Sequence, residues 1–309
     1  MSGPRNTGIP PGIEAVMSGI TITEPMASVP QEGRSLFCAE VWGGNEPVYR
    51  SVSIPGIQGV VYSHPCRGGR GGDVHYLSVC GSGLLSRVCV ADVVGHGEMV
   101  AAVSSAMHAH LRRSMDIPDQ RRVLRELHQR LEEIGLKAMT TAAALTYYAP
   151  SRSLTVSYAG HPPGWFLSPA ARTVTRLEVS SDGRRESGPV NLPLGTVFPS
   201  SYTRRKMRVT HGDRIVFVTD GVLETPGPDG EEFGVTGVQQ ILEETLDDSC
   251  EKVADALLSA LHRHATATDL EHDDVSFFIG EFVPGPPGPA LWHVLRNRVI
   301  RRLLPAARL

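Results

Sequence analysis

The sequence has few of the features that mark secreted, zinc-thiolate or membrane-spanning proteins. Its five cysteines are scattered and include no CxxC pair, so they indicate neither a disulfide framework nor a zinc site. No run approaches the roughly 18 to 20 apolar residues of a transmembrane helix, and residues 1–20 lack an apolar signal core. A formal net charge of -3 gives no overall basic footprint for nucleic acid. These absences favour a reduced, cytoplasmic setting.

The composition divides the chain into three parts. Residues 1–35 are rich in Gly, Pro and Ser without hydrophobic periodicity, which is typical of a flexible arm. Residues 36–283 are expected to form the globular domain, and a hydrophobic content of 41% is enough for a sizeable core. Residues 284–309 combine a Pro-Gly linker with a basic amphipathic segment. That tail could lie on an anionic membrane, dock into a partner's groove, or pack on its own domain or a second subunit.

Within the globular part, strands and helices are predicted in blocks. Helical periodicity and capping signals predict helices over 97–115 and 119–135, a third beginning at Thr236 with Gln239 in a capping box, and a fourth near Ser249. Short apolar or alternating runs predict strands over 84–92, 140–148, 153–159, 164–167, 214–220 and 274–282. Because these blocks lack βαβ alternation, the expected fold class is α+β, with antiparallel sheets and helices packed outside them.

Aspartates stand at the edges of several predicted strands. Asp92 and Asp220 each end an apolar run, Asp273 comes just before one, and Asp73 follows the glycines of "RGGRGGD". Strand ends from one sheet system can converge, and converging carboxylates repel one another unless a cation neutralises them. Hard divalent cations prefer oxygen ligands, and aspartate supplies them. The pattern therefore predicts a site for divalent cations.

The motifs "GGD...VADVVGHG...TTAAALTYY...SYAGHPP...NLPLG...HGDRIVFVTDGVLE...EEFG...HDDVSFF" occur in a distinctive order. In number, order and spacing they resemble the PPM-type metal-dependent protein serine/threonine phosphatases. The resemblance is closest to the branch named after the stage II sporulation phosphatase, which includes activators of stress sigma-factor pathways, and it covers residues 57–282. It implies two antiparallel sheets packed as a sandwich with helices on both outer faces, in agreement with the α+β prediction.

The resemblance also implies a role for each acidic motif. Asp92 would bridge two divalent cations, Mn²⁺ or Mg²⁺, and the backbone carbonyl of Val93 would face a metal. Asp220 and Asp273 would bind one ion, and Asp73 the other. A water or hydroxide bridging the two ions would then attack the phosphoryl group in line, without a covalent enzyme intermediate.

Basic residues beside these motifs are further candidates. His96 could donate a proton to the leaving alkoxide, or it could simply shape the Gly-His-Gly turn. Arg67 and Arg70 could bind the substrate phosphate, and a solvated basic loop is the alternative. Tyr76 stands where the related branch often has an acidic residue, which leaves the four metal aspartates intact.

The activity implied is hydrolysis of phosphoserine or phosphothreonine on a regulatory protein. In the related branch such a partner is often a phosphorylated anti-sigma-factor antagonist. Two alternatives stay open: a pseudophosphatase that binds a signalling partner without turnover, and a phosphatase for small phosphoesters. The four aspartates speak against the pseudophosphatase. The expected location is cytoplasmic, with membrane association through the tail as an alternative.

Overall fold

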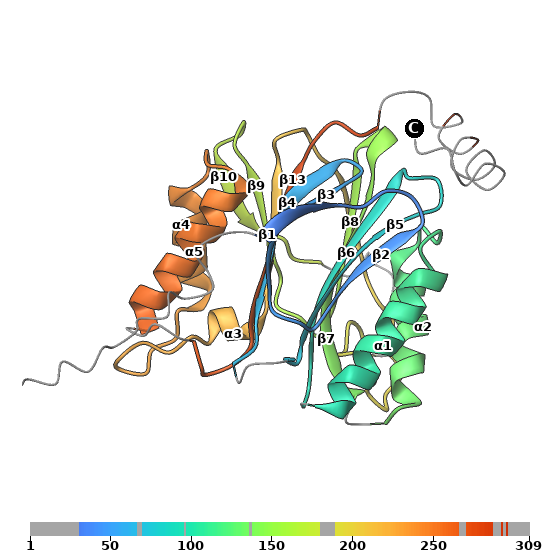
Figure 1. Cartoon of the computed structure of the whole chain (residues 1–309), viewed down its shortest axis with the longest axis horizontal. Helices are drawn as coiled ribbons and strands as arrows, with labels where there is room; N and C mark the ends of the chain where they lie inside the picture. The colour runs from blue at the N-terminus through green and yellow to red at the C-terminus, as the bar shows by residue number, and fades with distance from the viewer. Residues whose placement is uncertain are drawn as a thin grey trace, which may run out of the picture.

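Two β-sheets pack face to face, and helices cover the outer face of each sheet (Figure 1). This arrangement confirms the predicted α+β sandwich. The computed structural model describes residues 31–66, 70–95, 97–135, 138–179, 189–265 and 270–286, together with Trp292 and Leu295. Among these residues, none of the helices is both long and apolar enough to cross a lipid bilayer.

The first sheet has seven strands in the order β1-β3-β4-β13-β12-β9-β10. All neighbours are antiparallel except β1 and β3, which are parallel. The strands are β1 Gln31–Ser35, β3 Val48–Ile54, β4 Ile57–His64, β9 Trp165–Ser168, β10 Thr173–Arg176, β12 Arg214–Val218 and β13 Val275–Phe282. Strand β1 falls in the segment expected to be a flexible arm, residues 1–35, so the sheet begins before the expected boundary. Residues 1–30 lie outside the described residues.

The second sheet has six antiparallel strands in the order β11-β8-β7-β6-β5-β2. They are β2 Glu40–Gly44, β5 Asp73–Val79, β6 Leu85–Val93, β7 Thr140–Tyr148, β8 Ser153–Ala159 and β11 Arg205–Arg208. Every residue of β5 is buried, and so is nearly every residue of β6. These strands are covered on both faces, in keeping with the apolar run over residues 88–91 of β6.

The four predicted helices form, with a difference at the start of one. The structure adds the short helix α3 (Asp220–Leu223), so the strand predicted over 214–220 is shorter, and β12 ends at Val218. Helices α1 (Glu98–Arg113) and α2 (Gln120–Glu132) cover the second sheet, and α4 (Gly234–Glu244) and α5 (Cys250–Ala265) cover the first (Figure 1). The capping box predicted at Thr236 is wrong, because α4 begins at Gly234 without a side-chain cap. The side-chain Oε1 of Gln239 instead accepts a hydrogen bond from the indole N–H of Trp165 at 2.8 Å, which ties α4 to the first sheet.

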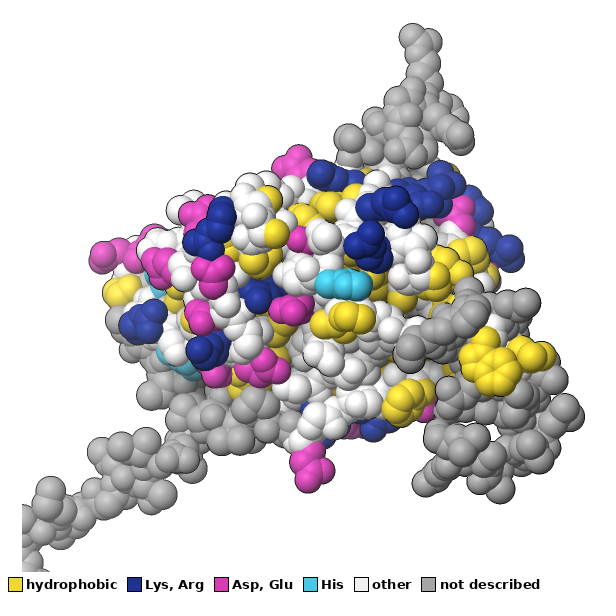
Figure 2. All heavy atoms as spheres, turned by 90° about the horizontal axis from the view of Figure 1, so that it is seen from above, with side chains coloured by type: hydrophobic (Ala, Val, Ile, Leu, Met, Phe, Trp, Pro, Cys, Tyr) yellow, Lys and Arg dark blue, Asp and Glu magenta, His cyan; other side chains and the backbone are white. Residues whose placement is uncertain are grey.

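Basic residues gather over one corner of the molecule, where Figure 2 shows Lys and Arg side chains crowded together. The edge strand β11 carries exposed Arg205, Lys206 and Arg208.

The basic tail lies outside the described residues except for Trp292 and Leu295, both exposed. Its contact with a membrane or a partner stays a prediction.

Candidate metal centre

Both sheets contribute carboxylates to one end of the sandwich. Asp73, at the start of β5, lies directly opposite Asp92 of β6 in the antiparallel pair. Asp220 begins the short helix α3 (Asp220–Leu223) just after β12, and Asp273 comes two residues before β13, which pairs with β12. The pairing of these strands therefore brings together residues far apart in the sequence.

Burial and the negative charges of neighbouring carboxylates raise the pKa values of these aspartates. Burial, followed by the negative charges of Asp220, Asp273 and Asp274, raises the pKa of Asp92 to about 7. Burial and the charge of Asp92 raise the pKa of Asp73, which is 2% exposed. None of these carboxylates pairs with a described Lys or Arg. Mutually repelling oxygen ligands without a basic partner fit a site for hard divalent cations.

The glycine loop packs closely against Asp92 and Val93. The amide of Val93 donates to the carbonyl of Gly72 at 3.1 Å. A Cβ atom at residue 72 would lie 2.8 Å from the carbonyl oxygen of Val93 and 3.3 Å from Oδ1 of Asp92. Any larger residue at this position would press on both predicted ligand atoms, so the close approach of the loop to them requires glycine.

Thr219 holds Asp73 across the two sheets. Its hydroxyl donates to Oδ2 of Asp73 at 2.8 Å and accepts a hydrogen bond from the backbone amide of Ser276 at 3.0 Å. The carboxylate of Asp73 at the start of β5 is thereby fixed to the ends of β12 and β13. Thr219 precedes Asp220 directly, so the same turn positions two predicted ligands.

Asp274 is a residue of the site to which the sequence assigns no role. The backbone amides of Cys66, Gly72 and Asp73 donate to its carboxylate. Its backbone carbonyl packs so closely against Gly221 that a Cβ atom there would overlap it. Asp274 therefore fastens the glycine loop before Asp73 to the start of β13. The only local signal for this role is the pair Asp273-Asp274 just before a strand, where the two side chains point to opposite sides of the chain.

Another possible ligand group lies nearby. Among the described residues, Cys66, Asp273 and Asp274 offer ligand atoms within 4.8 Å of one another, and no three of the four predicted aspartates meet that spacing. The carboxylate of Asp274 already accepts three amide hydrogen bonds, and a thiolate is a soft ligand that hard cations disfavour. We therefore prefer the four aspartates as the ligand set.

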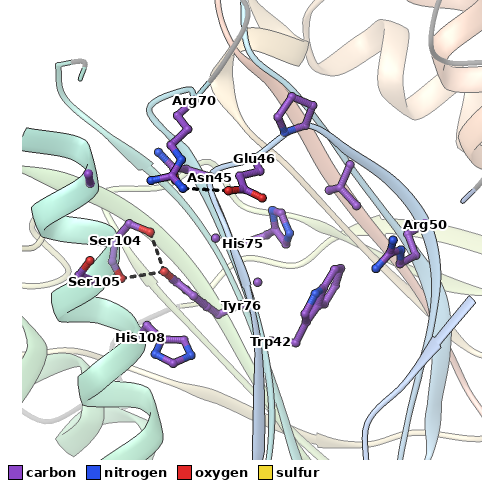
Figure 3. A pocket seen from close by; sticks show the side chains of 15 residues that line it. Trp42, Asn45, Glu46, Arg50, Arg70, His75, Tyr76, Ser104, Ser105 and His108 are labelled. Carbon is purple, nitrogen blue, oxygen red and sulfur yellow. Dashed lines mark hydrogen bonds and ion pairs between the residues drawn. The ribbon is translucent and has the colours of Figure 1, made fainter. Parts of the chain in front are cut away.

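Of the three basic residues predicted for the site, the structure describes only Arg70. Arg70 is exposed and pairs with Glu46 at 2.9 Å, a contact drawn in Figure 3. Arg67 and His96 lie outside the described residues, so their roles in phosphate binding and proton transfer stay predictions. The hydroxyl of Tyr76 donates to the carbonyl of Ser104 on α1 at 2.7 Å, so this side chain faces the helix layer.

Comparisons with solved structures identify the fold. It is similar to RsbX in complex with magnesium, with a TM-score of 0.55 and 18% identity over 76% of this chain and 100% of that one. It is similar to the RsbU and RsbW domains of a Mycobacterium tuberculosis protein (TM-score 0.60, 22% identity, 78% of this chain and 64% of that one). It is also similar to the Bacillus subtilis SpoIIE PP2C phosphatase domain with a fragment of its regulatory domain. That match has a TM-score of 0.58 and 15% identity, and it covers 80% of this chain and 64% of that one.

These similarities define a PP2C-type, or PPM-type, phosphatase fold. Residues 85–282, well over half of the chain, match the model of the stage II sporulation protein E (SpoIIE) family, and the chain belongs to that family. It is therefore a protein serine/threonine phosphatase of a family in which dependence on Mn²⁺ or Mg²⁺ is typical. No curated protein matches the chain.

The role of Asp274 can be tested by Asp274→Asn. The amide keeps the shape of the carboxylate but loses one acceptor oxygen, so the glycine loop and Asp73 should be held less firmly. Groups that orient metal ligands typically contribute about 10- to 100-fold to metal affinity. We expect the Mn²⁺ concentration for half-maximal activity to rise about 10-fold, with kcat at saturating Mn²⁺ changed only a few-fold. Asp229→Asn, at an exposed loop position, is the matched control. Identical Mn²⁺ titrations of the Asp274 variant and wild type would contradict the assignment.

The raised pKa of Asp92 predicts how the metal-free protein responds to pH. A carboxyl whose pKa is higher in the folded state stabilises the fold below its unfolded pKa, and this stabilisation is lost as pH rises through the folded pKa, here about 7. Asp92→Asn lacks this titration. In chelator, between about pH 5 and about pH 8, the wild type should therefore lose about 2–3 kcal/mol of unfolding free energy relative to the variant. Denaturant unfolding at each pH measures this. If the unfolding free energies of the wild type and the variant change in parallel with pH, Asp92 is not crowded by other carboxylates.

Proposed function

We propose that this chain hydrolyses phosphoserine or phosphothreonine on a regulatory protein, using two divalent cations, Mn²⁺ or Mg²⁺. Asp73, Asp92, Asp220 and Asp273 would hold the cations, with the backbone carbonyl of Val93 facing the same space. The observation that carries the proposal is the placement of Asp73 opposite Asp92 in the second sheet, with Asp220 and Asp273 at adjacent ends of the paired strands β12 and β13 of the first.

The cations, when bound, would lower the pKa of a water molecule and stabilise negative charge on the phosphoryl group. The protein's own contribution is positional. Strand pairing holds Asp73 opposite Asp92, and the Thr219 hydroxyl fixes the carboxylate of Asp73. Asp274 restrains the loop that precedes Asp73. A preorganised acidic site of this kind needs no nucleophilic side chain.

A protein substrate is favoured by apolar side chains exposed at the same end of the sandwich. Val94 directly follows the predicted ligand Val93 and is 46% exposed, and Phe198 is 64% exposed. The loop that carries Phe198 is held beside this end by two hydrogen bonds between Leu194 and Thr140, the first residue of β7. Exposed apolar groups around a polar site are typical of protein-binding surfaces. They support a phosphoprotein over a small phosphoester as the substrate.

Similarity to RsbU and RsbW domains suggests the kind of partner. We propose that the substrate belongs to a partner-switching system, with a phosphorylated anti-sigma-factor antagonist as the first candidate.

The catalytic assignment predicts that Asp92→Asn abolishes activity. The amide retains the size of the carboxylate but removes the charge that would bridge two cations, so Mn²⁺-dependent turnover should fall at least about 1,000-fold while the fold persists. Hydrolysis of p-nitrophenyl phosphate and of a phosphoserine protein measures this, with Asp229→Asn as the control. Near wild-type turnover by the Asp92 variant at saturating Mn²⁺ would show that the site is elsewhere. A wild type that binds a phosphoprotein without any turnover would support the pseudophosphatase alternative.

A further inference from the structure

Thr141 lies beside the predicted metal ligands in the second sheet. In the strand pairing, Asp73 of β5 lies opposite Asp92 of β6, and Asp92 lies opposite Thr141 of β7. Side chains of directly opposed residues point to the same face of a sheet, with Cβ atoms about 4.5–5.5 Å apart. The neighbours Ala91 and Ala142 pack in the core beneath α1 and α2, so Asp92 and Thr141 face the first sheet. The half-buried side chain of Thr141 therefore borders the predicted site.

A buried histidine holds the Thr141 hydroxyl. The Oγ1 atom of Thr141 lies 3.0 Å from Nδ1 of His161, and the two atoms share a hydrogen bond. His161 is 5% exposed. Burial lowers the pKa of its imidazole to about 4, and the backbone of Val218 opposes this shift only in part. The ring is therefore neutral at physiological pH, where one nitrogen carries a proton and the other does not.

The turn that carries His161 is fixed to both sheets. Gly160 forms a bridge with Ala142 of β7, in the second sheet. A Cβ atom at Gly164 would overlap the carbonyl oxygen of Val216 on β12, in the first sheet, so this close approach requires glycine. The imidazole lies between these two anchors, so it cannot turn away from its hydrogen-bond partner.

The surroundings of the imidazole decide which nitrogen carries the proton. Nε2 of His161 has no hydrogen bond of normal geometry among the described residues. The weaker contact with Val218 belongs to this nitrogen, because Nδ1 is already paired with Thr141. A carbonyl can only accept a hydrogen bond, so this contact favours a proton on Nε2. Nδ1 is then an acceptor, and the hydroxyl of Thr141 donates its only proton to it.

A Thr141 oxygen whose proton is directed at His161 can only accept further hydrogen bonds. A hydroxyl oxygen has two lone pairs, and the Thr141 side chain forms no other hydrogen bond with the described residues. Its next partner must therefore supply a proton. A water molecule has protons to donate, whereas the oxygens of a phosphate dianion have none.

We propose that Thr141 accepts a hydrogen bond from the attacking water, and that His161 is the positioning residue that directs the Thr141 oxygen toward this water. A water held in this way keeps a lone pair free to face phosphorus, and correct orientation lowers the barrier to attack. The overall reaction stays hydrolysis: the water oxygen bonds to phosphorus, the ester bond breaks, and one water proton ends on the released hydroxyl group. This inference rests on the proposed function.

Substitutions that keep the shape of Thr141 separate orientation of the water from support of the fold. Thr141→Val removes the hydroxyl, and we expect kcat with p-nitrophenyl phosphate at saturating Mn²⁺ to fall about 10- to 100-fold. KM and the calorimetric Mn²⁺ affinity should change less than about 3-fold, because the interaction is made by the attacking water alone. Thr141→Ser keeps the hydroxyl and should restore most of the kcat. Thr173→Val, at an exposed position of β10, is the matched control.

The hydrogen-bond roles can be measured without any turnover. Imidazole ¹⁵N chemical shifts of the full-length protein distinguish a protonated ring nitrogen from an unprotonated one. The signals missing from His161→Asn assign the ring among the 12 histidines. At neutral pH we expect the proton on Nε2, and a changed Nδ1 shift in Thr141→Val, where the hydrogen bond is lost.

A wild-type kcat in Thr141→Val would overturn the inference, and so would a proton on Nδ1, which would leave the Thr141 hydroxyl free to donate. Equal losses of kcat and Mn²⁺ affinity in both Thr141 variants would show a structural role and would overturn it too. A wild type without phosphatase activity would refute the proposed function, whereas an active wild type and an equally active Thr141→Val refute this inference alone.

Discussion

The site depends on repulsion between carboxylates that the two sheets hold at one edge. Pairing of β5 with β6 places Asp73 opposite Asp92, and the turn after β12 brings Asp220 close enough for its charge to raise the pKa of Asp92. Such crowding disfavours the metal-free fold, and cations that bind only the folded state would stabilise it. The hydrogen bonds from Thr219 and to Asp274 offset this repulsion by fixing the backbone around the ligands.

The sequence predicts the strands that carry the site more clearly than it predicts the side chains that hold the ligands in place. Apolar runs ending in Asp92 and Asp220 are recognisable because both strands are buried throughout most of their length. The role of Asp274 is not recognisable, since its amide partners lie 201 to 208 residues away in the chain. Edge strand β2 is equally hard to predict, because its two glycines weaken any strand signal. The predicted capping box is absent because α4 already begins at Gly234 and the Gln239 side chain pairs with Trp165.

The glycine loop before Asp73 is held from two sides. On one side, Asp274 accepts hydrogen bonds from the amides of Gly72 and Asp73, and on the other, Asn45 exchanges two hydrogen bonds with Gly71. These contacts fix the backbone that leads into Asp73, so the position of this predicted ligand depends on residues from three separate parts of the sequence.

The most direct test of the central claim is to locate the cations by anomalous X-ray scattering from crystals grown with Mn²⁺. The account predicts two Mn²⁺ ions that share Asp92, with Asp73 beside one and Asp220 and Asp273 beside the other. A single ion at Cys66 and Asp274, or ions that do not contact Asp92, would contradict it.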